Sequence, residues 1–156
     1  MPLRYHCAMT HEPDFRPADG NDGDCLVTLD NALSAHRQWK TILQAAVNDG
    51  KNLDVETIGR DDCCDLGRWL YSSGRSLYGG RPEFTNLVNK HREFHSITGV
   101  VAGFINARTH GDARAHLRGG SQFAFASMEV SIAIAALKAY VASNPASLKG
   151  NSDEIS

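Results

Sequence analysis

The sequence lacks several features that would assign it to a common functional class. Its 156 residues carry a net charge of −2 and no conspicuously basic segment, so nucleic acid and anionic membranes are poor candidate partners. The N-terminal residues contain no apolar segment of the kind found in signal peptides. The most apolar stretch, "VSIAIAALKAYVA", contains Lys138 and is short for a membrane span. We therefore expect a cytoplasmic protein that neither enters a membrane nor binds nucleic acid.

The sequence also shows no internal repeat and no alternation of apolar and polar residues that would indicate β-strands. Helical periodicity is present instead, and it predicts helices over residues 26–48, 61–72, 82–108 and 112–143. A pair of glycines is expected to interrupt the last of these. Three long segments, one short segment and tight turns predict an all-α fold. We expect an antiparallel four-helix-type bundle with one additional short helix that carries a cysteine.

The bundle is expected to occupy residues 25–143. Residues 1–24 are rich in Asp, Gly, Pro and Asn and show little periodicity, which predicts a flexible N-terminal segment. Residues 144–156 are expected to form a polar C-terminal tail.

Two histidines stand where the helical pattern predicts buried apolar residues. In "KHREFH", His91 and His95 are four residues apart, so their side chains point in nearly the same direction, one turn apart. His36 lies on the apolar stripe of the first predicted helix in the same way. A buried imidazole needs partners for its donor and its acceptor. The pattern leaves two interpretations open: the three histidines share one metal ion, or each bonds separately to a carbonyl or hydroxyl group.

A candidate fourth ligand lies in "CCDLGRWL". Cys63 and Cys64 are both close to the predicted start of the short helix, where the helix dipole favours a thiolate both as a ligand and as a nucleophile. Four cysteines in a reducing cytosol indicate metal binding, redox sensing or burial in the core rather than a disulfide framework. The alternative interpretation of Cys63 and Cys64 is that both are small buried hydrophobic residues.

Three motifs in this order resemble the chemoreceptor zinc-binding (CZB) domain family: "HRQWK" at 36–40, "CDLGRWLY" at 64–71 and "HREFH" at 91–95. The segment "GGSQFAFAS" at 119–127 is similar to the family's entry into its last helix. The resemblance extends over about residues 26–143.

The resemblance implies a Zn²⁺ cofactor, one per chain, held by His36, Cys64, His91 and His95. It further implies that four residues pack around the site: Trp39, Leu66, Gly67 and Trp69. Cys63 is one residue out of register with the motif and is expected to point elsewhere.

The resemblance also implies a regulatory function, the sensing of zinc availability or of oxidants such as hypochlorous acid through the zinc-bound thiolate of Cys64. It implies a homodimer as well. A site of one thiolate and three imidazoles leaves no open position for water, so we expect no catalytic residues and no enzymatic activity. CZB domains usually adjoin a signalling module, whereas little follows residue 143 here. We therefore expect a stand-alone member that acts in trans on a signalling protein such as a chemoreceptor or a cyclase. The alternative is a structural interaction bundle in which zinc only stabilises the fold.

Overall fold

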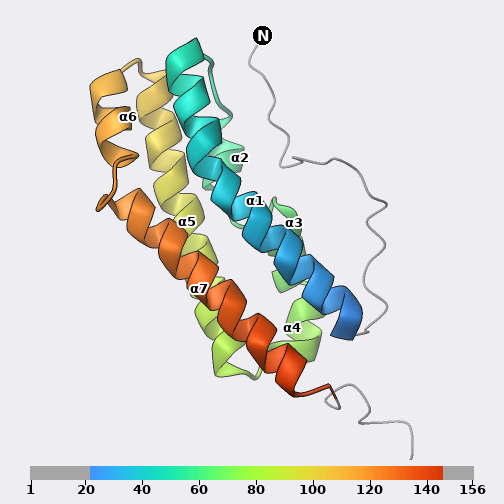
Figure 1. The fold of residues 1–156 in the computed structure, drawn as a ribbon. Coiled ribbons are helices and arrows are strands. Elements are labelled where there is room, and N and C mark those ends of the chain that lie inside the picture. Colours follow the sequence, from blue (N-terminus) through green and yellow to red (C-terminus); the bar gives the residue numbers. More distant parts are fainter. Residues whose placement is uncertain (1–21, 146–156) are drawn as a thin grey trace, which may run out of the picture.

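Three long helices form the frame of the structure, a computed structural model that describes residues 22–145. They are α1 (Asp22–Asp49), α5 (Pro82–Asn106) and α7 (Gln122–Ser143) (Figure 1). The short helices are α2 (Val55–Gly59), α3 (Asp65–Leu70), α4 (Ser73–Tyr78) and α6 (His110–His116). No strand occurs in this part of the chain, and the prediction of an all-α bundle is confirmed.

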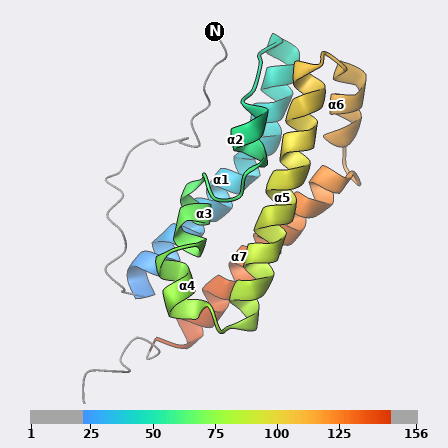
Figure 2. The same cartoon turned by 180° about the vertical axis from the view of Figure 1, so that it is seen from behind.

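The long helices do not surround the core evenly. Helix α7 packs against both α1 and α5, whereas α1 and α5 contact each other over a shorter length. Seen from behind, α2, α3 and α4 follow one another along the side opposite α7, between α1 and α5 (Figure 2). Three short helices thus occupy the place that a fourth long helix would take in a regular bundle.

Local signals explain where the long helices begin and end. Helix α1 is followed by Gly50, whose φ of +63° is the left-handed conformation that commonly ends a helix. Helix α5 begins with Pro82, which is well suited to the first turn. The hydroxyl of Ser121 caps α7 by accepting a hydrogen bond from the N–H of Ala124 at 3.1 Å.

The prediction of one helix over residues 61–72 is wrong in its first part. Residues 60–64 form a loop, which we call the cysteine loop, and α3 starts only at Asp65. Helices α2 and α4 were not predicted, because each is too short to show a helical period. Helix α1 starts at Asp22, inside the expected N-terminal segment; the rest of that segment and most of the expected tail lie outside the described residues.

Helix α7 carries large apolar side chains on its outer side as well as in the core. Phe125, Met128 and Ile132 are each more than half exposed. Among the described helices, α7 is long and apolar enough to cross a membrane, although a third of its most apolar stretch is buried in the bundle. Core helices of soluble proteins also meet these criteria, so this composition is weak evidence for a membrane span.

Helix α2 lies unusually close to α5. A Cβ atom at Gly99 would lie 2.9 Å from the Cα of Gly59, a distance that real Cβ atoms essentially never show. The absence of a side chain at Gly99 therefore allows the two backbones to approach each other. This approach brings the carbonyl of Ile58 to the face of α5 that carries the histidines.

Candidate metal centre

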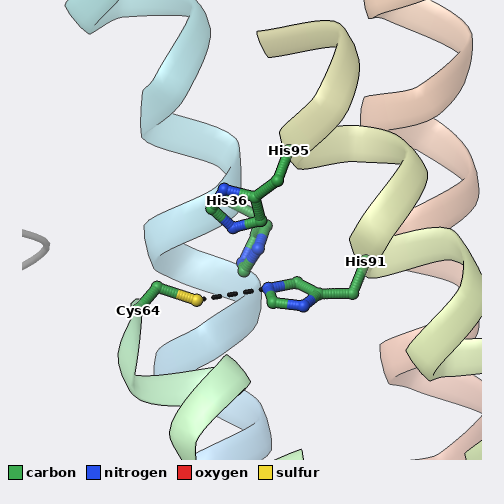
Figure 3. Close-up of side chains that lie close together, drawn as sticks. All are labelled: His36, Cys64, His91 and His95. Atoms are coloured by element: carbon green, nitrogen blue, oxygen red, sulfur yellow. Dashed lines mark hydrogen bonds between the residues drawn. The ribbon is translucent and has the colours of Figure 1, made fainter. Parts of the chain in front are cut away.

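Three imidazoles and one thiol converge between α1, α5 and the start of α3. His36 comes from α1, His91 and His95 from consecutive turns of α5, and Cys64 from the residue before α3 (Figure 3). One potential ligand atom from each residue lies within 4.8 Å of those of the other three. The structure thus brings together all four residues that the sequence resemblance implied as ligands.

The imidazoles are buried in an apolar environment. Their exposed fractions are 3% for His36, 0% for His91 and 1% for His95. The ring centroids of His91 and His95 are 4.6 Å apart, and that of His36 is 5.2 Å from His91. The ring of Phe94 lies 5.1 Å from that of His36 and separates the site from α7. Water therefore has little access to the histidine side of the site.

Backbone carbonyls orient two of the imidazoles. Nδ1 of His36 donates a hydrogen bond to the carbonyl of Ala32 at 2.7 Å, and Nδ1 of His95 donates to the carbonyl of Ile58 at 2.8 Å. Because a carbonyl oxygen can only accept, the proton of each ring is on Nδ1 and the lone pair is on Nε2. Neither of these buried Nε2 atoms has a hydrogen-bond partner among residues 22–145. Two buried, unpaired acceptors are costly unless a cation binds them.

His91 lies closest to the cysteine. Its Nε2 is 3.2 Å from Sγ of Cys64, and its buried Nδ1 has no hydrogen-bond partner in the described part of the chain. The dashed line in Figure 3 marks this contact. His91 therefore joins the imidazole side of the site to the thiol side.

Cys64 caps the N-terminus of α3. Its Sγ accepts a hydrogen bond from the N–H of Gly67 at 3.3 Å. A Cβ atom at Gly67 would lie 1.9 Å from the carbonyl oxygen of Asp61, so the cysteine loop folds back directly over the first turn of α3. A larger residue at this position would displace the loop and with it Sγ of Cys64.

Burial determines the charge of the imidazoles in the protein without metal. Removal from water lowers the pKa of His36 to about 4 and that of His91 to about 2, and it also lowers the pKa of His95. All three rings are consequently neutral at pH 7, and their lone pairs are available to a metal ion.

The thiol responds in the opposite sense to the one expected from the sequence. Burial raises the pKa of Cys64 to about 11, against the smaller effect of the hydrogen bond from Gly67. The N–H groups at the start of α3 lower the pKa of Cys64, as the sequence suggested, but desolvation has the larger effect, so the helix start does not make Cys64 a thiolate. A nearby cation would reverse this effect and stabilise the thiolate.

The donor set fits Zn²⁺. Imidazole and thiolate are preferred zinc ligands, and the absence of carboxylates among the four argues against Mg²⁺ or Ca²⁺. Tetrahedral zinc sites place their donor atoms roughly 3.3–3.8 Å apart. The separation of 3.2 Å between Cys64 and His91 is close to this range. Small side-chain rotations would close the remaining separations, which reach 4.8 Å.

Comparison with known families supports this assignment. The pattern of the family described as "CZB: Chemoreceptor zinc-binding domain" matches residues 36–101. This segment of the chain is similar to a chemoreceptor zinc-binding domain. The match begins at His36, includes Cys64 and both histidines of α5, and is shorter than the expected extent of residues 26–143. No curated protein and no solved structure matches the chain at a significant level.

The CZB family and the three-histidine, one-cysteine site together identify Zn²⁺, one per chain, as the cofactor. CZB domains are soluble, cytoplasmic, regulatory zinc-binding domains, and in chemoreceptors they act in signalling, often as dimers.

The residues expected to pack around the site lie at different distances from it. The ring of Trp39 is 6.4 Å from that of His95, so Trp39 covers one side of the histidine cluster. Leu66 is buried in the core. Trp69 packs against aromatic rings of α4 and α5 instead of against the histidines. It thereby anchors the short helices that follow Cys64.

Two contributions to the site could not be read from side-chain patterns, since both come from main-chain carbonyls. The hydrogen bond from His36 to the carbonyl of Ala32 joins residues four apart in one helix, so it is compatible with the predicted helix without any tertiary contact. The carbonyl of Ile58 belongs to α2, whose only local signal is its cap: Asp54 accepts a hydrogen bond from the N–H of Thr57 at 3.2 Å.

Proposed function

We propose that the CZB domain of this protein is a reversible zinc-dependent sensor in which His36, Cys64, His91 and His95 hold the ion and Cys64 is the redox-reactive residue. The observation that carries the proposal is the convergence of three buried imidazoles and one thiol within 4.8 Å. Bound Zn²⁺ would supply the positive charge that keeps the Cys64 sulfur a thiolate at neutral pH. With all four positions taken by protein ligands, the proposal includes no catalytic residue.

The unequal anchoring of the ligands supports a sensor over a purely structural site. The histidines are buried on the long helices α1 and α5, whereas Cys64 is only partly buried and belongs to a loop before a six-residue helix. The cysteine loop can separate from α5 while the contacts of the long helices stay intact. Zinc binding and the docking of this loop are then linked, as expected for a site that responds to zinc availability.

Oxidation would act on the same ligand. In the net reaction, the Cys64 thiolate and hypochlorous acid give a sulfenic acid and chloride: sulfur loses two electrons and gains the hydroxyl group, and chlorine gains the two electrons. The neutral sulfenic acid is a weaker ligand than the thiolate. The cysteine loop would then no longer be held to the histidines through Cys64.

The zinc content of the protein before and after one equivalent of hypochlorous acid tests this proposal. We expect one zinc per chain in the reduced protein and release of zinc on oxidation. The Cys63→Ser variant should behave like the wild type, because Cys63 contacts Asp62 and lies outside the cluster. The Cys64→Ser variant should bind zinc weakly, with an affinity that oxidant does not change. Zinc that remains bound to the oxidised wild type would favour the structural alternative, and a zinc-free protein would refute the site.

The proposal extends to a cytoplasmic homodimer that acts on a separate signalling protein, such as a chemoreceptor or a cyclase. The family supports this, and so does the apolar outer side of α7, where Phe125, Met128 and Ile132 follow one another at helical spacing. The molecular mass in solution tests it: a monomer at micromolar concentration would contradict this part of the proposal.

A further inference from the structure

A second polar cluster lies beside the metal centre, where the cysteine loop meets α5. The hydroxyl of Tyr71 donates a hydrogen bond to Oδ2 of Asp61. Arg92 contacts both residues: its Nη2 donates to the hydroxyl of Tyr71 at 3.3 Å, and its Nε lies 3.5 Å from Oδ2 of Asp61. The three side chains come from three different elements, namely the cysteine loop, the residue after α3, and α5.

The positions of these residues in the chain connect the cluster to the zinc ligands. Asp61 is three residues before Cys64, and Arg92 directly follows His91. The cluster therefore joins the same two parts of the structure that the contact between Cys64 and His91 joins. The Asp61 side chain is only 20% exposed, which protects its ion pair from full solvent screening although Arg92 is 60% exposed.

A neighbouring ion pair lacks this connection. Arg60 donates two hydrogen bonds to the carboxylate of Asp62, at 3.0 and 2.9 Å. Both residues belong to the cysteine loop and both are well exposed. This pair joins two exposed residues within the loop, whereas the Asp61 carboxylate links the loop to α5.

We propose that Asp61, Tyr71 and Arg92 form a tether that positions Cys64 against the histidines and controls how fast the cysteine loop leaves the metal centre. This inference rests on the proposed zinc site. When the Cys64 sulfur separates from the ion, the tether must also break before the loop can move away from α5. While the tether holds, the sulfur remains next to the ion and rebinds. The tether thus slows zinc loss and loop opening without itself providing a ligand.

Zinc-loaded variants test the tether. Tyr71→Phe removes the hydroxyl and Arg92→Ala removes the guanidinium, and zinc transfer to an excess of a chromogenic chelator is followed over time. We expect zinc transfer to the chelator to be about fivefold faster in each variant. This is the size of effect expected from the loss of a partly exposed, charge-assisted hydrogen-bond network. The double variant should be little faster than the single ones, because both changes break the same network. The rate of zinc transfer in Arg92→Lys should lie between those of the wild type and Arg92→Ala, because lysine keeps the positive charge but loses the planar guanidinium that can bond two partners at once.

Asp62→Asn is the control, because it breaks the ion pair with Arg60 in the cysteine loop and leaves the tether intact. Its zinc transfer should match the wild type. Hydrogen exchange of the same zinc-loaded proteins provides an independent readout: amides of residues 60–64 should exchange faster in the tether variants, and amides in α1 and α7 should not change. A merely structural role would instead change exchange throughout the bundle.

The outcomes separate the tether from the zinc site. Zinc-loaded tether variants that release zinc no faster than the wild type, or no faster than Asp62→Asn, would overturn the tether and leave the zinc site standing. A wild-type protein that binds no zinc would remove the proposed function and the tether together.

Discussion

Replacement of His91 by leucine is expected to weaken zinc binding several hundredfold and, at the same time, to stabilise the metal-free protein. The zinc affinity falls because a structural zinc site binds with about 10–16 kcal/mol shared among four ligands, so that one ligand accounts for about 2.5–4 kcal/mol. The metal-free protein gains stability because His91 is fully buried and its Nδ1 has no partner. An apolar side chain of similar size removes this unsatisfied group, an effect of about 1 kcal/mol or more.

Two measurements check this pair of effects. Competition with a chelator gives the zinc affinity, and urea unfolding in the presence of a strong chelator gives the stability of the metal-free protein. His116→Leu is a suitable control, because His116 stacks on Phe104 and lies outside the cluster. Unchanged zinc affinity in His91→Leu would refute His91 as a ligand. A loss of metal-free stability would show that leucine cannot occupy the space of the imidazole.

Acidification is expected to destabilise the metal-free protein between about pH 6.5 and pH 4. Burial lowers the pKa of His36 to about 4 and lowers those of His91 and His95. Histidines in the unfolded chain have a pKa of about 6.5. Below that value the unfolded chain binds protons that the folded protein does not bind, so the free energy of unfolding falls as the pH falls. His36 alone contributes a loss of about 3 kcal/mol over this range, at about 1.4 kcal/mol per pKa unit.

Urea unfolding of the chelator-treated protein at several pH values from 7 to 4 measures this effect. The slope of stability against pH should be smaller in His36→Leu, which has one buried imidazole fewer. The same pH dependence in the variant and the wild type would mean that His36 is accessible to protons in the folded state. With zinc bound, the metal should protect the protein at pH 7, and this protection should decrease towards pH 5 as protons compete for the lone pairs.

The histidine part of the site was accessible from the sequence because it depends on helical periodicity. His91 and His95 are one turn apart, and His36 replaces an apolar residue on its own stripe, so local pattern was sufficient to place three rings on inward faces. The long helices α1 and α5 were predicted for the same reason, to within a few residues at each end. The helix predicted over residues 112–143 is two helices in the structure, α6 and α7, which are separated near the glycine pair that was expected to interrupt it.

The cysteine part was not accessible in the same way, because its position depends on tertiary contacts. "DDCCD" has the acidic residues of a helix start, yet the chain stays in a loop until Asp65. That loop is held by contacts between residues that are far apart in the sequence, such as Asp61 and Arg92. The pKa of Cys64 could not be predicted from the sequence either, since the direction of its shift depends on burial.

The two carbonyl-oriented histidines differ in how much of the protein they require. His36 is oriented by the carbonyl of Ala32, one turn earlier in the same helix, so a single helical turn contains both the ligand and its support. His95 relies on the carbonyl of Ile58, which reaches it because Gly99, without a side chain, lets the backbones of α2 and α5 meet. A protein designer could therefore introduce a histidine oriented like His36 into another helix by transferring one helical turn. The His95 arrangement can be transferred only together with a second helix and a glycine at the position of Gly99, which lets that helix dock.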